Sequence, residues 1–288
     1  MCIFIQKSAS RWLHDDQLRN RLREELSLRA LSWAEDNELP HECTIGNQPS
    51  VLFREGDDAT HGNFHPASYK CIRKKPEWNR RLRKSHTSAR RNLASHDAER
   101  GELDTAASSD ALLMNIFCHP QAFGAGSSLR QLLATQAPER LQFGWKPRIP
   151  LAANHIERTE IDLRIGDLSI EAKLTEAEFQ RSPRAWVERY RGFSSVFEVD
   201  LLPQTTNSYL HYQLIRGVLS AYAEQGTRYS VICDARRPDL VDAWFSVTRA
   251  VRLVSLRSQL QLVTWQEIAA TLPKTMRTWL SKKYGIEA

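Results

Sequence analysis

Two short runs of alternating polar and apolar residues, separated by the dipeptide Gly166-Asp167, constrain the fold of this chain more than any other feature. Apolar residues recur at positions 161, 163 and 165 of the first run and at 168, 170, 172 and 174 of the second. A repeat of two residues is typical of a β-strand that is buried on one face. A Gly-Asp pair suits the tight turn between two such strands. We therefore predict a β-hairpin over residues 161–175.

The polar positions of this hairpin bring acidic and basic side chains to a shared face. Asp162 lies in the first run, and Glu171 and Lys173 lie in the second. Two neighbouring carboxylates repel each other, and a hard divalent cation relieves that repulsion. A lysine beside such a cation can orient a water molecule and help to stabilise its deprotonated form. The alternative is a solvated strand face with alternating charges, which does not explain the order acid, turn, acid, apolar residue, lysine.

This order of residues resembles the signature of the PD-(D/E)XK nuclease superfamily. Asp162 matches the first acid, and Glu171-Ala172-Lys173 matches the (D/E)-x-K triplet, whereas Ile161 replaces the proline. The resemblance covers roughly residues 106–272, where the predicted order of elements is helix, strand, strand, helix, strand. It implies an α/β fold with a restriction-endonuclease-like core, in which a mixed β-sheet is flanked by helices. The rest would be a mainly helical, basic N-terminal region.

The resemblance also implies a set of site residues and a cofactor. The expected cofactor is Mg²⁺ or Mn²⁺, bound by Asp162, Glu171, the carbonyl of Ala172 and Glu160, and Lys173 would position the attacking water. A polar residue on the helix after the third core strand often faces the metal in this superfamily, and Gln213 is the candidate, although it could equally be a surface residue. Asp110 could add a further ligand, but a role at the start of a helix is favoured.

A strongly basic segment precedes this region. Residues 70–91 hold ten Lys or Arg and one acid, Glu77, so the segment has a charge of +9. The net charge of the whole chain is +6, so the remaining residues sum to −3. A localised excess of one sign suits a polyanion, with phosphate contacts that weaken as salt rises. The predicted nucleic-acid-binding residues are Arg80, Arg81, Arg83, Lys84 and, on the later helix, Arg216.

Periodicity and turn residues suggest how the rest of the chain is organised. Helices are expected from Asp15 to about Glu35, from Pro76 onward, after Ser108 or Ser109, and from Ser127. A helix over residues 209–224, a strand over 228–235 and a strand leading into Thr264 should complete the core. Residues 37–69 look irregular and 95–109 look like a linker. We predict a helical or irregular basic region over residues 1–105, which could bind nucleic acid as an appendage, and a nuclease-like catalytic domain over 106–288.

Several classes of protein lack support in the sequence. No apolar run approaches the ~20 residues needed to span a bilayer, and no GxxxxGK[ST] loop indicates ATP use. Five scattered cysteines favour reduced thiols and a cytoplasmic location. The favoured interpretation is a metal-dependent nuclease that hydrolyses phosphodiester bonds, most simply a restriction or defence DNA endonuclease acting on double-stranded DNA. A repair or recombination nuclease, a catalytically idle nucleic-acid-binding protein and a protein that binds an acidic partner remain alternatives, and a homodimer is left open.

Overall fold

The computed structural model describes residues 2–44, 50–84, 101–136 and 140–288, with side chains from residue 17 onward. The chain forms two compact units, which we call the sheet unit (residues 1–18 and 139–264) and the helical unit (residues 19–138 and 265–288). The helical unit therefore contains both early and late parts of the chain. The boundary predicted from sequence, between residues 105 and 106, divides the chain by function into a binding appendage and a catalytic domain. That division stays a prediction.

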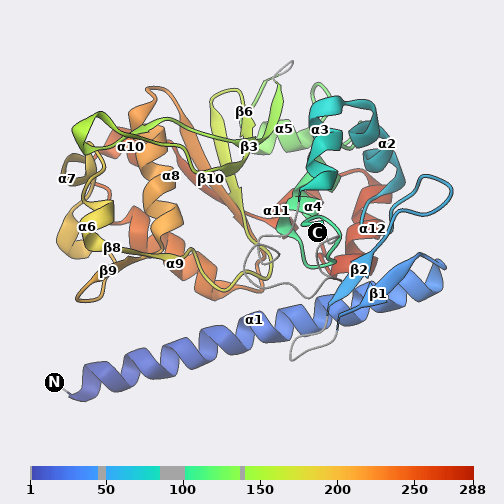
Figure 1. The fold of residues 1–288 in the computed structure, drawn as a ribbon, viewed down its shortest axis with the longest axis horizontal. Helices are drawn as coiled ribbons and strands as arrows, with labels where there is room; N and C mark the ends of the chain where they lie inside the picture. Colours follow the sequence, from blue (N-terminus) through green and yellow to red (C-terminus); the bar gives the residue numbers. More distant parts are fainter. Residues whose placement is uncertain (1, 45–49, 85–100, 137–139) are drawn as a thin grey trace. The chain divides into compact units, whose positions relative to one another are not determined.

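The sheet unit is built on a mixed β-sheet of five strands in the order β11-β10-β7-β6-β3. Strands β3, β6 and β7 are antiparallel neighbours, whereas β7, β10 and β11 run parallel (Figure 1). The sheet thus confirms the predicted fold class. The strands are β3 (Leu141–Trp145), β6 (Ile161–Ile165), β7 (Leu168–Ala172), β10 (Arg228–Cys233) and β11 (Leu260–Thr264).

The predicted hairpin is formed by β6 and β7. Gly166 adopts a positive φ of 55° in the turn, a conformation that glycine reaches without steric cost. Leu163 pairs with Ile170, and Arg164 pairs with Ser169. Because opposed residues in a sheet point to the same side, this register puts the even positions of β6 and the odd positions of β7 on one face.

Helices α8 (Tyr212–Ala223) and α9 (Pro238–Thr248) pack on that same face. Gly217 of α8 allows a close approach, since a Cβ there would lie 2.0 Å from the Tyr229 ring of β10. The core between helices and sheet includes Leu214 and Val218 of α8, together with Val231 of β10. This packing fixes the position of α8 over the polar face of the hairpin.

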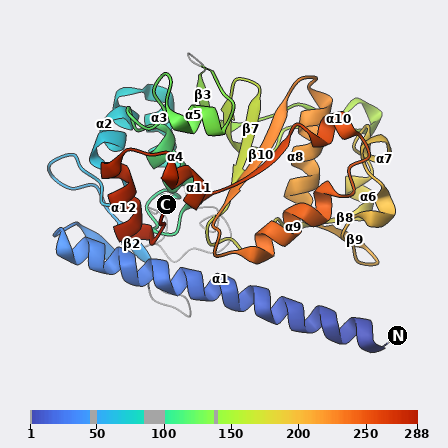
Figure 2. The same ribbon diagram turned by 180° about the vertical axis from the view of Figure 1, so that it is seen from behind.

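Short elements complete the sheet unit. Figure 2, seen from behind, shows helices α6, α7 and α10 on the side of α8 that faces away from β7. The elements are β4 (Ile149–Pro150), β5 (Ile156–Glu157), β8 (Arg181–Pro183), α6 (Arg184–Val187), α7 (Phe193–Val196), β9 (Ser208–Leu210) and α10 (Val254–Arg257), with 3₁₀ turns at Ala152–Asn154 and Val199–Leu201.

The helical unit contains the basic segment. The predicted stripe on the first long helix is confirmed, because Leu22, Leu26 and Ala30 are buried. Phe53 belongs to a small cluster with Ala30 and Ala34. The elements are α1 (Cys2–Asp36, of which residues 19–36 belong to this unit), β1 (His41–Cys43), β2 (Val51–Phe53), α2 (Pro66–Lys74), α3 (Pro76–Asn79), a 3₁₀ turn (Arg80–Arg83), α4 (Ser109–Phe117), α5 (Ser128–Leu132), α11 (Trp265–Ala270) and α12 (Lys274–Tyr284).

Several predicted boundaries were wrong. The first helix begins at Cys2 and not at Asp15, and α8 begins at Tyr212 because residues 208–210 form β9. The helix that Pro76 opens gives way to a 3₁₀ turn after one turn. Residues 37–69, expected to be irregular, contain β1, β2 and the start of α2. Strand β3 and helix α9 were not anticipated, whereas the caps at Ser108 and Ser127 are confirmed.

Candidate active site

Glu171, near the end of β7, is the centre of a buried polar cluster in the sheet unit. Lys173 donates a hydrogen bond from Nζ to Glu171 Oε1 over 2.8 Å. Gln213, in the first turn of α8, donates from Nε2 to the same oxygen over 2.9 Å. The structure therefore brings together three of the residues predicted from sequence: Glu171 of β7, Lys173 just after that strand, and Gln213 of the helix that covers it.

Asp162 joins this cluster from the neighbouring strand β6. Its Oδ2 accepts a hydrogen bond from the backbone N–H of Ala172 over 2.7 Å. The register of the hairpin continues from the pair Leu163 and Ile170 to Asp162 and Glu171, so both carboxylates belong to the same face. Asp162 is partly exposed, whereas Glu171 is buried. One carboxylate is thus accessible to solvent beside one that is enclosed.

The electrostatics of the cluster hold Lys173 in its charged form. Burial alone would lower the pKa of Lys173, but the carboxylates of Glu171, Glu176 and Asp162 together raise it above its ordinary value. The ammonium group therefore stays protonated throughout the neutral range. It can donate hydrogen bonds and stabilise negative charge, but it does not serve as a base at neutral pH.

Arg216, one turn after Gln213 on α8, lies inside the cluster and not at the surface. Its side chain is 2% exposed, it donates from Nη2 to the carbonyl of Glu160 over 3.1 Å, and the same nitrogen lies 3.7 Å from Glu171 Oε2. Burial opposes its charge, yet Glu171 and Glu157 raise its pKa above the ordinary value. This burial favours a role in positioning Glu171 over the predicted grip on a nucleic-acid backbone.

Two oxygen atoms of the cluster are suited to a cation. Within the described residues, Glu171 Oε2 and Gln213 Oε1 are buried and have no hydrogen-bond partner. No group of three or more His, Cys, Asp or Glu side chains in the described part of the chain is arranged to hold a metal. Mg²⁺ commonly binds through one or two carboxylates and keeps several waters. The carboxylates of Asp162 and Glu171 therefore fit Mg²⁺ as its two carboxylate ligands. Glu160 and the carbonyl of Ala172 stay predicted ligands.

Arg237 was missed by the sequence analysis and supports the segment that follows Lys173. It is fully buried, forms an ion pair with Asp239 at 2.6 Å, and donates to the carbonyls of Leu174 and Glu176 over 3.4 and 3.1 Å. Its bonds to this segment reach across about sixty residues of sequence. The one local hint of such a contact is an Arg-Arg pair two residues after the buried strand β10.

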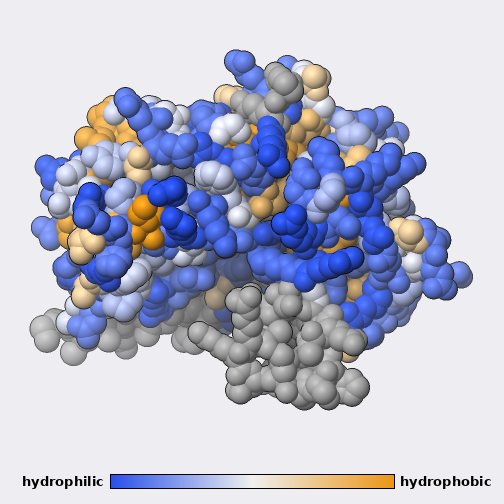
Figure 3. Space-filling model, turned by 45° about the horizontal axis from the view of Figure 1, so that its top comes forward, coloured by the Kyte–Doolittle hydropathy of each residue, from blue (hydrophilic) through white to orange (hydrophobic). Residues whose placement is uncertain are grey.

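The basic segment in the helical unit separates into paired and unpaired cations. Arg81 donates to Asp110 over 2.9 Å, and Lys84 lies 2.9 Å from Glu102 and 3.6 Å from Asp110. Arg80 and Arg83 are exposed and have no carboxylate partner among the described residues. Arg90 and Arg91 lie outside the described residues. The surface over α2 and α3, at the right of Figure 3, is mainly hydrophilic.

Asp110 has the role at the start of a helix that the sequence favoured. It lies in the first turn of α4, after the cap at Ser108, and its carboxylate is engaged by Arg81. Arg81 and Lys84 of the same unit balance the charge of the Asp110 carboxylate, so its position does not call for a metal.

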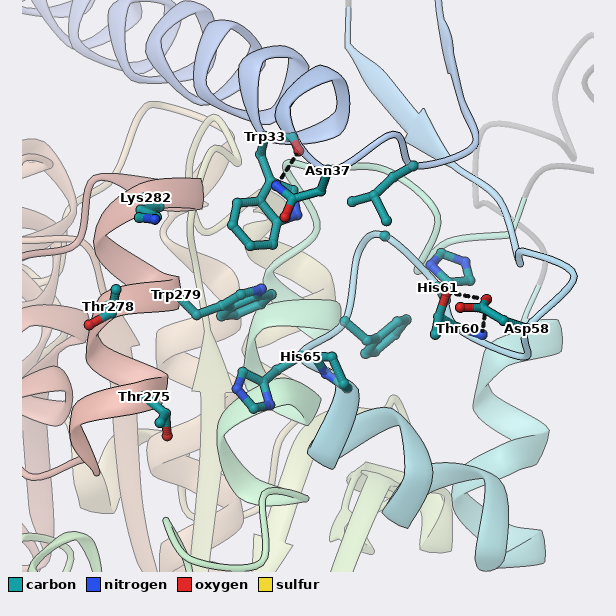
Figure 4. A pocket seen from close by; sticks show the side chains of 14 residues that line it. Trp33, Asn37, Asp58, Thr60, His61, His65, Thr275, Thr278, Trp279 and Lys282 are labelled. Atoms are coloured by element: carbon teal, nitrogen blue, oxygen red, sulfur yellow. Dashed lines mark hydrogen bonds between the residues drawn. The ribbon is translucent and has the colours of Figure 1, made fainter.

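A pocket of about 470 Å³ lies in the helical unit (Figure 4). Two tryptophans line it, Trp33 of α1 and Trp279 of α12, and Figure 4 shows Trp33 above Trp279. None of the residues predicted for the active site lines it. The pocket and the Glu171 cluster therefore have no residue in common. Its lining is Trp33, Asn37, Leu39, Asp58, Thr60, His61, Gly62, Phe64, His65, Pro66, Thr275, Thr278, Trp279 and Lys282.

A mixed sheet with paired carboxylates and a lysine on the face below a helix defines an α/β protein with a restriction-endonuclease-like core. The family described as "Restriction Endonuclease associating with ARP" matches residues 28–285, and the chain belongs to that family. No curated protein and no solved structure matched the chain. Among the described residues, no helix is both long enough and apolar enough to cross a membrane.

Proposed function

We propose that this protein is a nuclease of the PD-(D/E)XK type, dependent on Mg²⁺ or Mn²⁺, that hydrolyses phosphodiester bonds of DNA. The observation that carries the proposal is the convergence of Lys173 and Gln213 on one oxygen of Glu171, with the other oxygen free of hydrogen bonds. Membership of a restriction-endonuclease family supports the same activity. A restriction or defence role is favoured within this proposal.

Each residue has a role that follows from its surroundings. Asp162 and Glu171, with the carbonyl of Ala172 and with Glu160, would hold the metal, which when bound supplies a Lewis acid that stabilises charge on the attacked phosphate. Lys173 stays protonated, so it can hold a water molecule by donation and favour its deprotonated form. Gln213 fixes the orientation of the Glu171 carboxylate through its amide.

The helical unit would supply the grip on the substrate backbone. Arg80 and Arg83 are exposed cations, and Lys70 and Lys74 are exposed on α2. A group of exposed cations binds phosphates regardless of the base sequence of the nucleic acid. Double-stranded DNA is the proposed polymer for this contact.

The same cluster could also serve a protein that binds nucleic acid without cutting it. Lys173 and Arg216 balance the negative charge of Glu171, and Lys173 and Gln213 donate hydrogen bonds to its Oε1. The same contacts would occur in a purely structural ion cluster. Cleavage separates these two functions, because only the nuclease breaks a phosphodiester bond.

The test is incubation of the pure protein with plasmid, linear duplex, single-stranded DNA and RNA, with Mg²⁺, with Mn²⁺ and with EDTA. We expect cleavage of DNA that requires the metal and is lost in Lys173→Ala. Lys146→Ala, at an exposed lysine of the same unit, is the matched control and should cut like the wild type. Folded protein that binds DNA but cuts none of these substrates with either metal would overturn the proposal.

A further inference from the structure

Trp186 is an exposed aromatic side chain on α6 in the sheet unit. It is 37% exposed, although a large apolar surface in water is unfavourable. Its orientation is nevertheless fixed. The indole Nε1 donates to the Tyr212 hydroxyl over 3.4 Å, and the Arg189 guanidinium carbon lies 4.8 Å from the ring centroid. An exposed ring that is held in place by two contacts is pre-oriented for a partner.

The contacts of Trp186 connect it to the candidate active site. Tyr212 is the first residue of α8 and immediately precedes Gln213, which binds Glu171. The Tyr212 hydroxyl also lies 2.6 Å from the hydroxyl of Tyr190, which is buried. Figures 1 and 2 both show α8 between β10 and α6. Two successive residues of α8 therefore link the ring to the site, since Tyr212 contacts Trp186 and Gln213 contacts Glu171.

The surroundings of Trp186 are basic. Four arginines occur between residues 181 and 191, against one acid, Glu188. Two of them have carboxylate partners, since Arg181 pairs with Glu178 and Arg184 pairs with Glu188. Arg189 has no carboxylate partner within the described residues, and its guanidinium lies against the Trp186 ring. An aromatic ring with an available cation beside it is the combination that proteins use for single-stranded nucleic acid.

We propose that Trp186 stacks on an unpaired base of the strand that occupies the active site, with Arg189 contacting an adjacent phosphate. The inference rests on the proposed nuclease function and specifies its substrate, DNA that is unpaired next to the cleaved bond and double-stranded where the helical unit grips it. In a duplex the faces of internal bases are covered by their neighbours. A fixed exposed indole therefore gains little from an intact duplex and much from an unpaired base.

The experiment measures binding in EDTA, so that no cleavage is needed. Fluorescence anisotropy would give the affinity of the full chain for a labelled single-stranded deoxyoligonucleotide, for a blunt duplex of the same sequence, and for an abasic deoxyribose phosphate oligomer of the same length. The proteins are the wild type, Trp186→Ala, Trp186→Phe and the matched control Phe245→Ala. Phe245 is 59% exposed on α9 of the same unit. Thermal melting would verify that each variant is folded.

We expect Trp186→Ala to weaken single-stranded binding roughly tenfold, as loss of one base-aromatic stack does. Trp186→Phe should retain most of the affinity, and Phe245→Ala should leave it unchanged. The affinity of Trp186→Ala for the duplex and for the abasic oligomer should match that of the wild type. Equal losses on all three polymers, or no loss at all, would overturn the stacking proposal, the latter result being the one expected if Trp186 serves a protein partner.

The outcome is distinguishable from failure of the nuclease function. Metal-dependent cleavage together with unchanged binding by Trp186→Ala would overturn only the stacking proposal. A selective loss of single-stranded binding in a protein that cuts no substrate would overturn the nuclease function and its cleaved substrate, while showing that the Trp186 surface binds unpaired bases.

Discussion

The ammonium group of Lys173 and the carboxylate of Glu171 form a direct ion pair of 2.8 Å in which both side chains are almost completely buried, at 7% and 3% exposure. The two residues are separated by only one position on the strand, so they share a face. Buried ion pairs contribute little net stability, because desolvation offsets their attraction. A buried charge with a raised pKa, such as that of Lys173, is more common at functional sites than elsewhere.

The raised pKa of Lys173 predicts how this pair contributes to stability as pH changes. A group whose folded pKa exceeds its unfolded value stabilises the fold fully below the unfolded pKa, 10.5 for lysine, and loses that contribution as pH rises through the folded pKa. Lys173→Met should therefore lower the free energy of unfolding by about 3 kcal/mol. Urea denaturation should show the same difference from the wild type between pH 6 and 9. If the difference instead became smaller as the pH rises from 6 to 9, Lys173 would be losing its proton near neutral pH.

Removal of charge from Asp162 should weaken metal binding without loss of the fold. Asp162→Asn keeps an oxygen that can accept from the Ala172 N–H but loses the negative charge that a hard cation requires. Calorimetric titration with Mg²⁺ in the absence of DNA should show an affinity lower by at least about tenfold. The control is Asp167→Asn, which removes an exposed carboxylate from the turn of the same hairpin. Equal metal affinity in both variants would remove Asp162 from the metal site.

The hairpin and its polar face could be predicted because they depend on local pattern. A repeat of two residues and a Gly-Asp turn fix both strands and their register, and the register alone places Asp162, Glu171 and Lys173 on one side. Gln213 could be proposed because the resemblance implies a polar residue facing the metal on the helix after the third core strand. These predictions require no knowledge of long-range packing.

Other features depend on contacts that the local sequence does not encode. Arg216 looks like a surface cation on an amphipathic helix, but Gly217 lets α8 approach Tyr229 closely, and the arginine is enclosed beside Glu171. Arg81 looks free in a basic run, yet its partner Asp110 lies 29 positions away. Strand β3 was missed because Gly144 and Trp145 weaken its pattern, and its role as an edge strand comes from pairing with β6.

The paired and unpaired cations of the basic segment should behave differently. Arg80→Gln with Arg83→Gln should reduce the slope of log affinity against log salt, by up to ~0.9 per lost duplex phosphate contact, with unchanged stability. Arg81→Gln should instead lower the free energy of unfolding by about 1–3 kcal/mol, because it takes a partner from buried Asp110. DNA-binding titrations at several salt concentrations and chemical denaturation measure the two effects. An unaltered slope in the Arg80 and Arg83 double variant would assign the phosphate contacts elsewhere.

Close packing of α8 on the sheet should be necessary for the site. In Gly217→Ala the new Cβ would meet the buried Tyr229 ring at 2.0 Å, so the helix must move outward. We expect a loss of about 1–3 kcal/mol in stability and lower cleavage in protein that remains folded, because Gln213 and Arg216 move with α8. Ser220→Ala, one turn later on the same helix, is the control and should have a smaller effect on both measurements. Wild-type cleavage by Gly217→Ala would show that the position of α8 does not matter for the chemistry.

Lys173 is proposed to act on the chemistry of hydrolysis and not on binding. The most direct measurement compares DNA cleavage with DNA affinity for Lys173→Ala and Lys146→Ala at matched metal and salt, in protein verified as folded by thermal melting. We expect Lys173→Ala to abolish cleavage while its affinity for DNA stays within a few fold of the wild type, and Lys146→Ala to change neither. Cleavage by Lys173→Ala at the wild-type rate would contradict the assignment of the active site.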